Sequence, residues 1–515
     1  MESDLILELN HITKRFGEVV ANDKVDLSLK KGEILSVLGE NGSGKTTLMN
    51  ILSGIYFPDD GEVRINGKSV SIRSPQDAFD LGIGMVHQHF MLVKIMTAAE
   101  NIILGMEGEN RLNMQQVEEQ VARVVKEYGF DLDPAEKIYN MSVSQKQTVE
   151  IVKVLYRGAE ILILDEPTAV LTPQETEKLF AVMRNMKAAG KSIIIITHKL
   201  NEVLEISDRV SVLRKGRYIG TVETKNATVG SLTEMMVGEK VDLDFGREEP
   251  VSRVKRIEME HVSVTGADGR NVLTDISFTA FSGEILGIAG ISGNGQRELL
   301  EAIAGLQTIA TGEITYYPPD ADKTSLTNKS VEEIRRLGVS LSFVPEDRLG
   351  MGLVANMDMT DNMMLRSFRS GKGLIANRKD PKALAERIIQ QLEVVTPGTA
   401  TPVRRLSGGN VQKVLVGREI AVKPRVLMTA YPVRGLDINS SYTIYHLLNE
   451  QKKNGAAVIC VGEDLDVLIG LCDRILVLAG GSVSGIVDAR TTTKEEVGML
   501  MGGMKQTKTA QEEKA

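Results

Sequence analysis

The feature that most constrains this chain is an internal repeat, because one series of short segments occurs twice in the same order. The first copy contains "GEILSVLGENGSGKTTL", "MSVSQKQ", "ILILDEPTAVLT" and "SDRVSVLRKG"; the second contains "GEILGIAGISGNGQREL", "LSGGNVQK", "VLMTAYPVRGLD" and "CDRILVLAGG". The spacing changes only by short insertions, which indicates a duplicated domain. We predict one domain at residues 1–240, a charged linker without periodicity at 241–254, a second domain at 255–505 and a flexible polar tail at 506–515.

Each half alternates short apolar runs with segments of helical periodicity. Runs such as "EILSVLG" and "ILILD" are typical of buried strands in a parallel sheet. Apolar residues at helical spacing follow both glycine-rich loops: Leu48, Ile51, Leu52 and Ile55 in the first half, and Leu299, Ile303 and Leu306 in the second. We therefore predict an α/β fold, doubly wound, in both halves.

Composition and charge argue against several classes of protein. The net charge of −8 gives no sign of a nucleic-acid surface, so we expect no nucleic-acid partner. The cysteines, Cys460 and Cys472, are too few for a disulfide framework or a zinc cluster, and we expect reduced thiols in the core. The segment "MESDLILELN" does not resemble a signal peptide, and no apolar run approaches the roughly 20 residues of a membrane helix. Any link to a membrane should therefore run through a partner.

A phosphate-binding loop is the clearest chemical motif. "GENGSGKT" fits the pattern G-x-x-x-x-G-K-[ST], with an apolar run before it and helical spacing after it. Backbone N–H groups in such a loop and the positive end of the helix attract phosphates. Lys45 would bridge the β- and γ-phosphates, and Thr46 would bind Mg²⁺. The candidate nucleotide-binding residues here are Gly39, Glu40, Asn41, Gly42, Ser43, Gly44, Lys45, Thr46 and Thr47. The alternative is a glycine-rich turn with an exposed lysine.

Two further strand ends carry candidate catalytic residues. "ILILDEP" places Asp165, a candidate Mg²⁺ ligand, beside Glu166, a carboxylate that could orient or deprotonate an attacking water. The alternative is a solvated acidic pair at a strand end. His198 follows the run "IIIIT" and could contact the γ-phosphate, although a lone histidine after a strand is more often structural.

These motifs together resemble the ATP-binding cassette (ABC) family over almost the whole chain. The resemblance consists of the phosphate loop Gly39–Thr47, Gln88 in "VHQ", and the segments "SVSQ", "DEP" and "THK". The tandem form, with "TAVLTPQE" in the first half and "FVPEDR", "LSGGNVQK" and "RGLD" in the second, is similar to the ATPase subunit of bacterial simple-sugar and nucleoside importers. The segment "HQHFMLVKIMTAAENIILG" looks more like the nucleoside importers. The resemblance implies two P-loop NTPase domains, each with a mostly parallel sheet, a β-subdomain and a helical subdomain.

The same resemblance implies an activity, a location and partners. The chain would hydrolyse ATP with Mg²⁺ and drive solute import through membrane-spanning permease subunits, expected to be two. An extracytoplasmic solute-binding protein would act indirectly, and the chain would lie at the cytoplasmic face of the cell membrane as a peripheral protein. The cargo stays open between nucleosides and sugars such as ribose or galactose, because the permease and the binding protein select it.

The resemblance also assigns residues to two composite sites. Family cassettes pair head to tail, so each ATP would lie between the phosphate loop of one half and the signature helix of the other. Phe16 would stack on adenine, and Gln88 would reach Mg²⁺ and signal to a permease. The site on the first loop keeps its residues and meets an intact signature in the second half at Ser407, Gly408 and Gly409.

The losses collect in the other site. The replacements are Gln296 for the lysine, Arg297 for the threonine, Ala430 and Tyr431 for the acidic pair, Glu346 for the glutamine, Glu463 for the histidine, and Val143 and Ser144 for the signature glycines. We predict one hydrolysing site and one degenerate site that is structural or slow. The charge of Arg297 leaves ATP binding without hydrolysis open at the degenerate site. The alternative is a second half that only scaffolds the first.

Two other functions compete with the importer. A soluble tandem ABC protein that acts on ribosomes or DNA should carry a long basic linker or zinc-binding cysteines, and usually two intact sites. This chain has a short linker of mixed charge, two cysteines and one degenerate site. A non-catalytic ATP sensor would conflict with the presence of Glu166.

Overall fold

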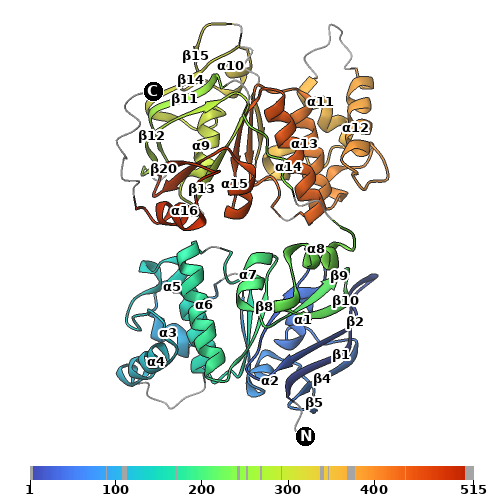
Figure 1. Ribbon diagram of the computed structural model, residues 1–515, viewed down its shortest axis with the longest axis vertical. Coiled ribbons are helices and arrows are strands. Elements are labelled where there is room, and N and C mark those ends of the chain that lie inside the picture. The colour runs from blue at the N-terminus through green and yellow to red at the C-terminus, as the bar shows by residue number, and fades with distance from the viewer. Residues whose placement is uncertain are drawn as a thin grey trace. The chain divides into compact units, whose positions relative to one another are not determined.

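The computed structural model describes residues 4–87, 90–106, 113–169, 171–240, 244–250, 253–266, 269–291, 293–319, 321–336, 341–345, 347–367, 377–434 and 436–504. The chain divides into two compact units, Met1–Val241 and Asp242–Ala515 (Figure 1). Each unit has its own pair of sheets and its own hydrophobic cores.

The first unit is built on a six-stranded sheet in the order β10-β9-β3-β8-β7-β6. Its strands are β3 (Ile34–Leu38), β6 (Ile83–Val86), β7 (Ile161–Asp165), β8 (Ser192–Ile196), β9 (Arg209–Arg214) and β10 (Arg217–Glu223). All neighbouring strands run parallel except β9 and β10. Every residue of β3 and β8 is buried, which is why these strands read as continuous apolar runs.

A four-stranded antiparallel sheet in the order β2-β1-β4-β5 completes the β-structure of the first unit. Its strands are β1 (Leu5–Phe16), β2 (Val19–Lys30), β4 (Asp60–Ile65) and β5 (Lys68–Val70). Helix α1 (Lys45–Leu52) packs against both sheets, because its Leu48 shares one core with Leu9 of β1 and Val37 of β3. The helix that starts at the phosphate loop is therefore fixed by the main core of the unit.

A helical group makes the third part of the first unit. Helices α3 (Ala98–Ile103), α4 (Met114–Tyr128) and α5 (Val143–Tyr156) share a separate core that includes Ile102, Val121 and Val149. The antiparallel sheet and this helical group lie at opposite ends of the unit (Figure 1). The remaining helical elements are α2 (Pro75–Asp80), α6 (Pro173–Ala188), α7 (Leu200–Ile206), α8 (Val229–Val237), and the short turns Ile138–Asn140 and Thr224–Asn226.

The second unit repeats this architecture strand for strand. Its antiparallel sheet runs β12-β11-β14-β15 and its main sheet runs β16-β17-β18-β13-β19-β20. The strands are β11 (Lys255–Thr265), β12 (Asn271–Phe281), β13 (Glu284–Gly290), β14 (Ile309–Tyr316), β15 (Thr324–Ser325), β16 (Leu341–Val344), β17 (Val426–Ala430), β18 (Ala457–Val461), β19 (Arg474–Ala479) and β20 (Ser482–Asp488). Two mostly parallel α/β domains, as the sequence predicts, are thus confirmed.

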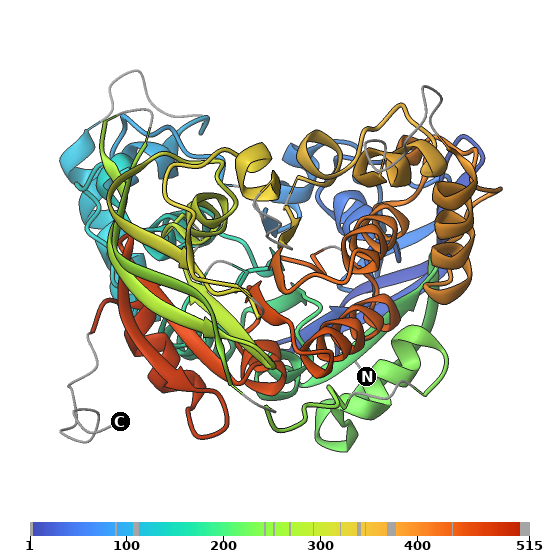
Figure 2. The same ribbon diagram turned by 90° about the horizontal axis from the view of Figure 1, so that it is seen from above.

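The helices of the second unit follow the same plan. They are α9 (Gln296–Ile303), α10 (Val331–Arg336), α11 (Met359–Ser367), α12 (Lys379–Gln391), α13 (Gly408–Ala421), α14 (Ile438–Lys453), α15 (Leu465–Leu471), α16 (Lys494–Met501), and the short turns Arg348–Gly352 and Val403–Arg405. Figure 2 shows the antiparallel strands (yellow-green) and the helices α11–α13 (orange) on opposite sides of this unit. Cys460 and Cys472 are buried and unpaired in its core. Within the described ranges, no helix has the length and apolarity to cross a bilayer.

The sequence places two apolar residues wrongly in helices. Ile55 and Leu306 fit the helical spacing, but α1 ends at Leu52 and α9 ends at Ile303, and both residues are exposed. The cause is the glycine that follows each helix, which has a φ of 75° at Gly54 and 76° at Gly305. A Cβ at Gly54 would lie 2.1 Å from a backbone oxygen, so close chain approach stops the helix there.

The predicted linker is part of the second unit over its described residues, 244–250 and 253–254. The ring of Phe245 stacks on Tyr442 with ring centroids 5.4 Å apart, and Asn449 Nδ2 donates to the carbonyl of Phe245 at 2.5 Å. Gly470 leaves room for the ring, because a Cβ there would lie 2.4 Å from a ring carbon of Phe245. Absence of periodicity in the sequence therefore does not mean absence of contacts.

This segment, residues 244–250, is called the connector. It covers an ion pair whose counterpart in the first unit is exposed to solvent. Lys452 Nζ lies 2.8 Å from Asp473 Oδ1 and also donates to the carbonyl of Glu248 at 2.5 Å. The two charged side chains are 3% and 1% exposed. The equivalent pair of the first unit, Lys187 and Asp208, lies 2.6 Å apart with side chains 36% and 40% exposed.

Candidate nucleotide site

The glycine-rich loop connects β3 to α1 in a conformation that only glycine allows at Gly44. This residue caps the helix with a φ of 95°, and a Cβ on it would lie 2.4 Å from the carbonyl oxygen of Ala21. A glycine-rich loop that leads into a helix N-terminus offers an anion the backbone N–H groups of the first turn, which have no partner within the helix. This geometry suits an anion.

Lys45 lies inside the loop. Its side chain is buried, and Nζ donates to the carbonyls of Gly39 at 2.6 Å and Glu40 at 2.9 Å. Burial lowers the pKa of Lys45, and the carboxylates of Glu166 and Asp165 oppose this effect. Lys45 is therefore not the exposed lysine of an ordinary turn, and a polyphosphate placed in the loop would meet a poorly solvated cation.

The other predicted residues of the loop lie around this lysine. Gly39, Ser43 and Lys45 are buried, Glu40, Gly44 and Thr47 are half-buried, and Asn41, Gly42 and Thr46 are exposed. Phe16, at the end of β1, is exposed and packs edge-on against Tyr56 with ring centroids 5.2 Å apart. Its ring is thus held by a neighbour and open to solvent, as a stacking platform for a base requires.

The acidic pair stands where β7 ends. Glu166 has a φ of 47°, and its N–H donates to the carbonyl of Ile196 on β8 at 2.8 Å. Its Oε1 lies 2.9 Å from Nδ1 of His198, and because a carboxylate only accepts, Nδ1 carries the proton. This hydrogen bond lowers the pKa of Glu166, although burial opposes it. Burial, followed by the charge of Glu166, raises the pKa of Asp165.

The carboxyl group of Asp165 fits a divalent cation. Burial and the neighbouring charge of Glu166 disfavour its anion, so a positive ion between this carboxylate and the phosphates would stabilise it. Thr46 and Asp165 carry oxygen atoms, the donor type that Mg²⁺ prefers. Gln88, the third predicted ligand, lies outside the described residues, as does Glu346 in the second half.

The signature residues lie at the start of a helix in the second unit. Ser407 caps α13, where its Oγ accepts from the backbone N–H of Asn410 at 3.4 Å and from Asn410 Nδ2 at 2.9 Å. Gly408 and Gly409 form the first turn, and Ser407 and Gly408 are exposed. Ser142 caps α5 of the first unit in the same way, with Gln145 as its partner. Both serines therefore sit at helix N-termini, which favour anions.

The second loop keeps the frame and loses the charge. Gly295 caps α9 with a φ of 98°, but the buried amide of Gln296 donates to the carbonyl of Ile291 at 3.0 Å. Arg297 pairs with the buried Glu301 at 2.7 Å, so its charge is already neutralised. A cavity of about 380 Å³ adjoins this pair, lined by Arg297, Glu301, Phe343, Pro345, Asp347, Met351 and Ala430.

The acidic turn of the second unit is also rebuilt. Tyr431 occupies the position of Glu166 with a φ of 50°, and its N–H donates to the carbonyl of Val461 at 3.0 Å. Arg434 lies over the ring of Tyr431, 5.5 Å from its centroid, and pairs with Glu463 at 3.2 Å. No carboxylate is left at either position of the former acidic pair.

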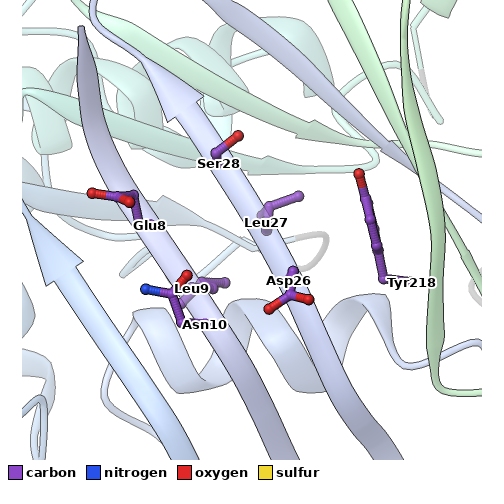
Figure 3. A pocket seen from close by; sticks show the side chains of 7 residues that line it. All are labelled: Glu8, Leu9, Asn10, Asp26, Leu27, Ser28 and Tyr218. Carbon is purple, nitrogen blue, oxygen red and sulfur yellow. The ribbon is translucent and has the colours of Figure 1, made fainter. Parts of the chain in front are cut away.

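A small hollow on the outer strands does not belong to this site. Figure 3 shows that Glu8 and Asn10 on β1, Asp26 and Ser28 on β2, and Tyr218 on β10 line it. Its volume of about 110 Å³ is well below the roughly 300 Å³ of the smallest usual ligand pockets. None of the predicted nucleotide residues lines it.

Sequence reasoning missed residues that hold the acidic turn in place. Gln147 on α5 donates from Nε2 to the carbonyl of Pro167 at 2.5 Å, and Lys199 Nζ donates to the carbonyl of Thr168 at 3.0 Å. A signal for Gln147 was present, because the repeat aligns it with Gln412, and this glutamine persists where the catalytic residues are replaced.

A buried loop lysine beside an acidic strand end defines a P-loop ATPase, here in tandem with a second cassette. The family described as ABC transporter matches residues 22–169 and 273–430. The nucleoside import ATP-binding protein NupA of Lactococcus lactis is 42% identical over 98% of this chain and 99% of its own length. The glucose import ATP-binding protein TsgD13 of Haloferax volcanii is 40% identical over 98% of this chain and 96% of its own length. The chain belongs to the ABC transporter family.

One solved structure is similar over both units. The archaeal ribosome recycling factor aABCE1, in complex with the ribosomal stalk protein aP1, matches with a TM-score of 0.60 over 93% of this chain and 90% of that chain. The two sequences are 18% identical, so this likeness shows the fold alone. The relatives above, which share far more of the sequence, are import proteins, and they do not favour the alternative of a ribosome or DNA factor.

Proposed function

We propose that the chain is the ATP-hydrolysing, energy-coupling subunit of an ABC import complex for nucleosides or simple sugars. The names of its relatives support import, and they include both a nucleoside and a glucose system. The observation that carries the proposal is the contrast between the units: the first holds Lys45 and the Glu166–His198 pair, and the second holds Gln296 and Tyr431 at the matching positions.

The residues of the first unit divide the work of binding. Residues Gly39–Thr47 enclose the phosphates, Lys45 offsets their charge, and Phe16 stacks on the adenine. Thr46 and Asp165, with Gln88, would hold Mg²⁺. When bound, Mg²⁺ supplies positive charge to the phosphate oxygens.

Glu166 acts on the water that attacks the γ-phosphate. The hydrogen bond from His198 favours the ionised carboxylate, which can accept a proton or a hydrogen bond from that water. The ring of His198 is exposed, and its Nε2 can donate to the γ-phosphate when both ring nitrogens carry a proton. Loss of that phosphate would thus affect Glu166 through the hydrogen bond between His198 and Glu166.

We infer one composite site that hydrolyses ATP and one degenerate site. The competent site combines the loop of the first unit with Ser407, Gly408 and Gly409 of the second. The degenerate site combines Gln296 and Arg297 with the signature at Ser142. Losses from both halves collect in one site, which supports selection on sites rather than decay of one half.

Import requires partners in the membrane. Exposed apolar side chains follow β6 and reach into the helical group, at Met91, Ile95, Leu104 and Met106. Their contact with a permease would remove this apolar area from water. The chain would thus sit at the cytoplasmic face of the cell membrane as a peripheral protein, beside two permease subunits that receive cargo from a solute-binding protein.

The test compares two signature serines in the complex with its permease partners. Ser407→Arg and Ser142→Arg each place a bulky cation at one helix N-terminus, one in each composite site. We expect Ser407→Arg to abolish ATP turnover and Ser142→Arg to leave at least half of it. Equal loss in both variants would contradict the assignment of a single hydrolysing site.

A further inference from the structure

The turn that carries Glu166 is strained and needs support from its surroundings. A φ of 47° is uncommon for a residue with a side chain, and such conformations persist only where neighbours fix them. One support is the hydrogen bond from Glu166 N–H to Ile196 on the adjacent strand. Another is internal, from Ala169 N–H to the carbonyl of Glu166 at 3.2 Å. Neither bond holds the peptide that follows, whose carbonyl belongs to the buried Pro167.

Gln147 supplies the missing donor. Its side chain is buried, and Nε2 lies 2.5 Å from the carbonyl oxygen of Pro167. The orientation of the amide is fixed by chemistry, because a carbonyl only accepts and the nitrogen must therefore face it. The amide oxygen of Gln147 has no hydrogen-bond partner among the residues described. Among the residues described, the hydrogen bond to Pro167 is thus the polar contact that accounts for a glutamine in this core.

The second unit repeats the contact around a turn that has no carboxylate. Gln412 is buried on α13, and its Nε2 donates to the carbonyl of Pro432 at 2.7 Å. The turn keeps its other features, since Tyr431 has a φ of 50° and Arg434 N–H donates to its carbonyl at 3.2 Å. The glutamine therefore accompanies the backbone conformation of the turn, both where the turn carries a carboxylate and where it does not.

We propose that Gln147 is a positioning residue for Glu166, which it holds through the Pro167 carbonyl. The proposal rests on the proposed function of Glu166. Gln147 lies on α5, the helix that Ser142 caps, whereas Glu166 lies at the end of a strand in the main sheet. This hydrogen bond therefore joins the helical group to the turn that carries the carboxylate, so that a tilt of α5 would change the aim of Glu166.

The effect of losing this bond should be partial, because the turn has a further anchor. Lys199 Nζ donates to the carbonyl of Thr168 at 3.0 Å and pairs with Glu202. This anchor lies beyond Pro167 and holds the far side of the turn. Removal of the Gln147 donor should therefore loosen Glu166 without releasing it.

The experiment uses the full chain with its permease partners and compares Gln147→Met with Gln412→Met. Methionine keeps the length and apolar contacts of the side chain and cannot donate a hydrogen bond. We expect Gln147→Met to lower kcat about tenfold with the affinity for Mg²⁺–ATP within a factor of two, since geometry errors of this kind act on the reacting step. Gln412→Met should lower thermal stability to a similar extent and leave kcat within a factor of two. Equal effects on kcat, or an unchanged kcat in Gln147→Met, would overturn the proposal.

A second variant keeps the test decisive if Gln147→Met does not fold. Gln147→Glu has the shape of the native side chain, and its carboxyl can donate to Pro167 only when protonated. Its kcat relative to the native protein should therefore rise as the pH falls from 9 to 6, on the order of tenfold across the titration. A ratio that does not change with pH contradicts the positioning role. If Glu166→Gln itself retained native turnover, the proposed function would have failed instead.

Discussion

The turns after β7 and β17 have the same backbone and opposite chemistry. Glu166 and Tyr431 share a left-handed φ, the same backbone hydrogen bond to the next strand and a glutamine behind the turn. Only the first presents a carboxylate, and its partner is His198, whereas Tyr431 is covered by Arg434. Backbone strain at this position is therefore a property of the fold. Strain alone would point to two catalytic turns, whereas the side chains favour the turn of Glu166.

The two loops lead to the same conclusion. Both helices start at a glycine with a φ near 95°, and both loops direct a buried side-chain nitrogen at a loop carbonyl. In the first loop this nitrogen belongs to the cation Lys45, and in the second to the neutral amide of Gln296. The amide fills the space of the lysine and preserves the frame, but it offers a phosphate no charge.

The largest effect should come from the carboxylate itself. Glu166→Gln removes the group that accepts from water and should lower ATP turnover by about 100- to 1000-fold, in the usual range for a general base. Tyr431→Phe, the matched change in the second unit, should leave turnover within a factor of two. For both variants, steady-state assays of the complex measure ATP turnover, and equilibrium binding measures the affinity for Mg²⁺–ATP. A comparable loss in Tyr431→Phe would mean that the second turn takes part in chemistry.

The next effect concerns stability and the connector. Lys452→Ala removes one of the two cations that pair with the buried carboxylate of Asp473. This loss should cost about 3 kcal/mol of unfolding free energy. Lys187→Ala breaks the equivalent pair in the first unit, where solvent already screens both charges, and should cost less than about 1 kcal/mol. Chemical denaturation followed separately for the two units gives both values. Similar costs in the two variants would show that the connector does not shield the pair.

The smallest effect is a shift of the pH profile. The hydrogen bond from His198 lowers the pKa of Glu166, so the carboxylate stays ionised, and active, to a lower pH than an ordinary glutamate. His198→Ala removes this cause and should move the acidic limb of the residual turnover to higher pH. Glu463→Ala, the matched change, should leave the limb in place. A limb that stays unmoved in His198→Ala would assign the titration to another group, such as Asp165.

Much of the fold followed from patterns that depend on local physics. The duplication, the buried strands and the loop glycines were readable, because each leaves a fixed order or period in the sequence. The ends of α1 and α9 were not, because Ile55 continues the helical period and only the approach of another backbone segment at Gly54 stops the helix. Helical periodicity predicts which face of a helix is buried, but it does not predict what lies beyond the last turn of the helix.

The charged residues of the site could be predicted from the sequence, but the contacts that hold the acidic turn in place could not. Lys45, Asp165 and Glu166 come from motifs that follow strands, and the structure brings their charges close enough to act on one another. The repeat aligns Gln147 with Gln412 and so marks this glutamine, but no motif reveals its contact with Pro167, which lies in the turn after a different element. The connector was missed for the same reason, since the pocket that holds Phe245 is formed by α14 and Gly470.

The packing of the connector fixes where this chain can be cut. A recombinant second half that begins at β11 would lack Phe245 and Glu248, and would open the aromatic pocket and the Lys452–Asp473 pair to water. A half that begins before Phe245 keeps both covered. The first half needs no such cover. On the surface that corresponds to the pocket of Phe245, Glu205 and Arg184 form an ion pair that is exposed to solvent. Separation into two genes would therefore succeed only with the cut placed on the first unit's side of the connector.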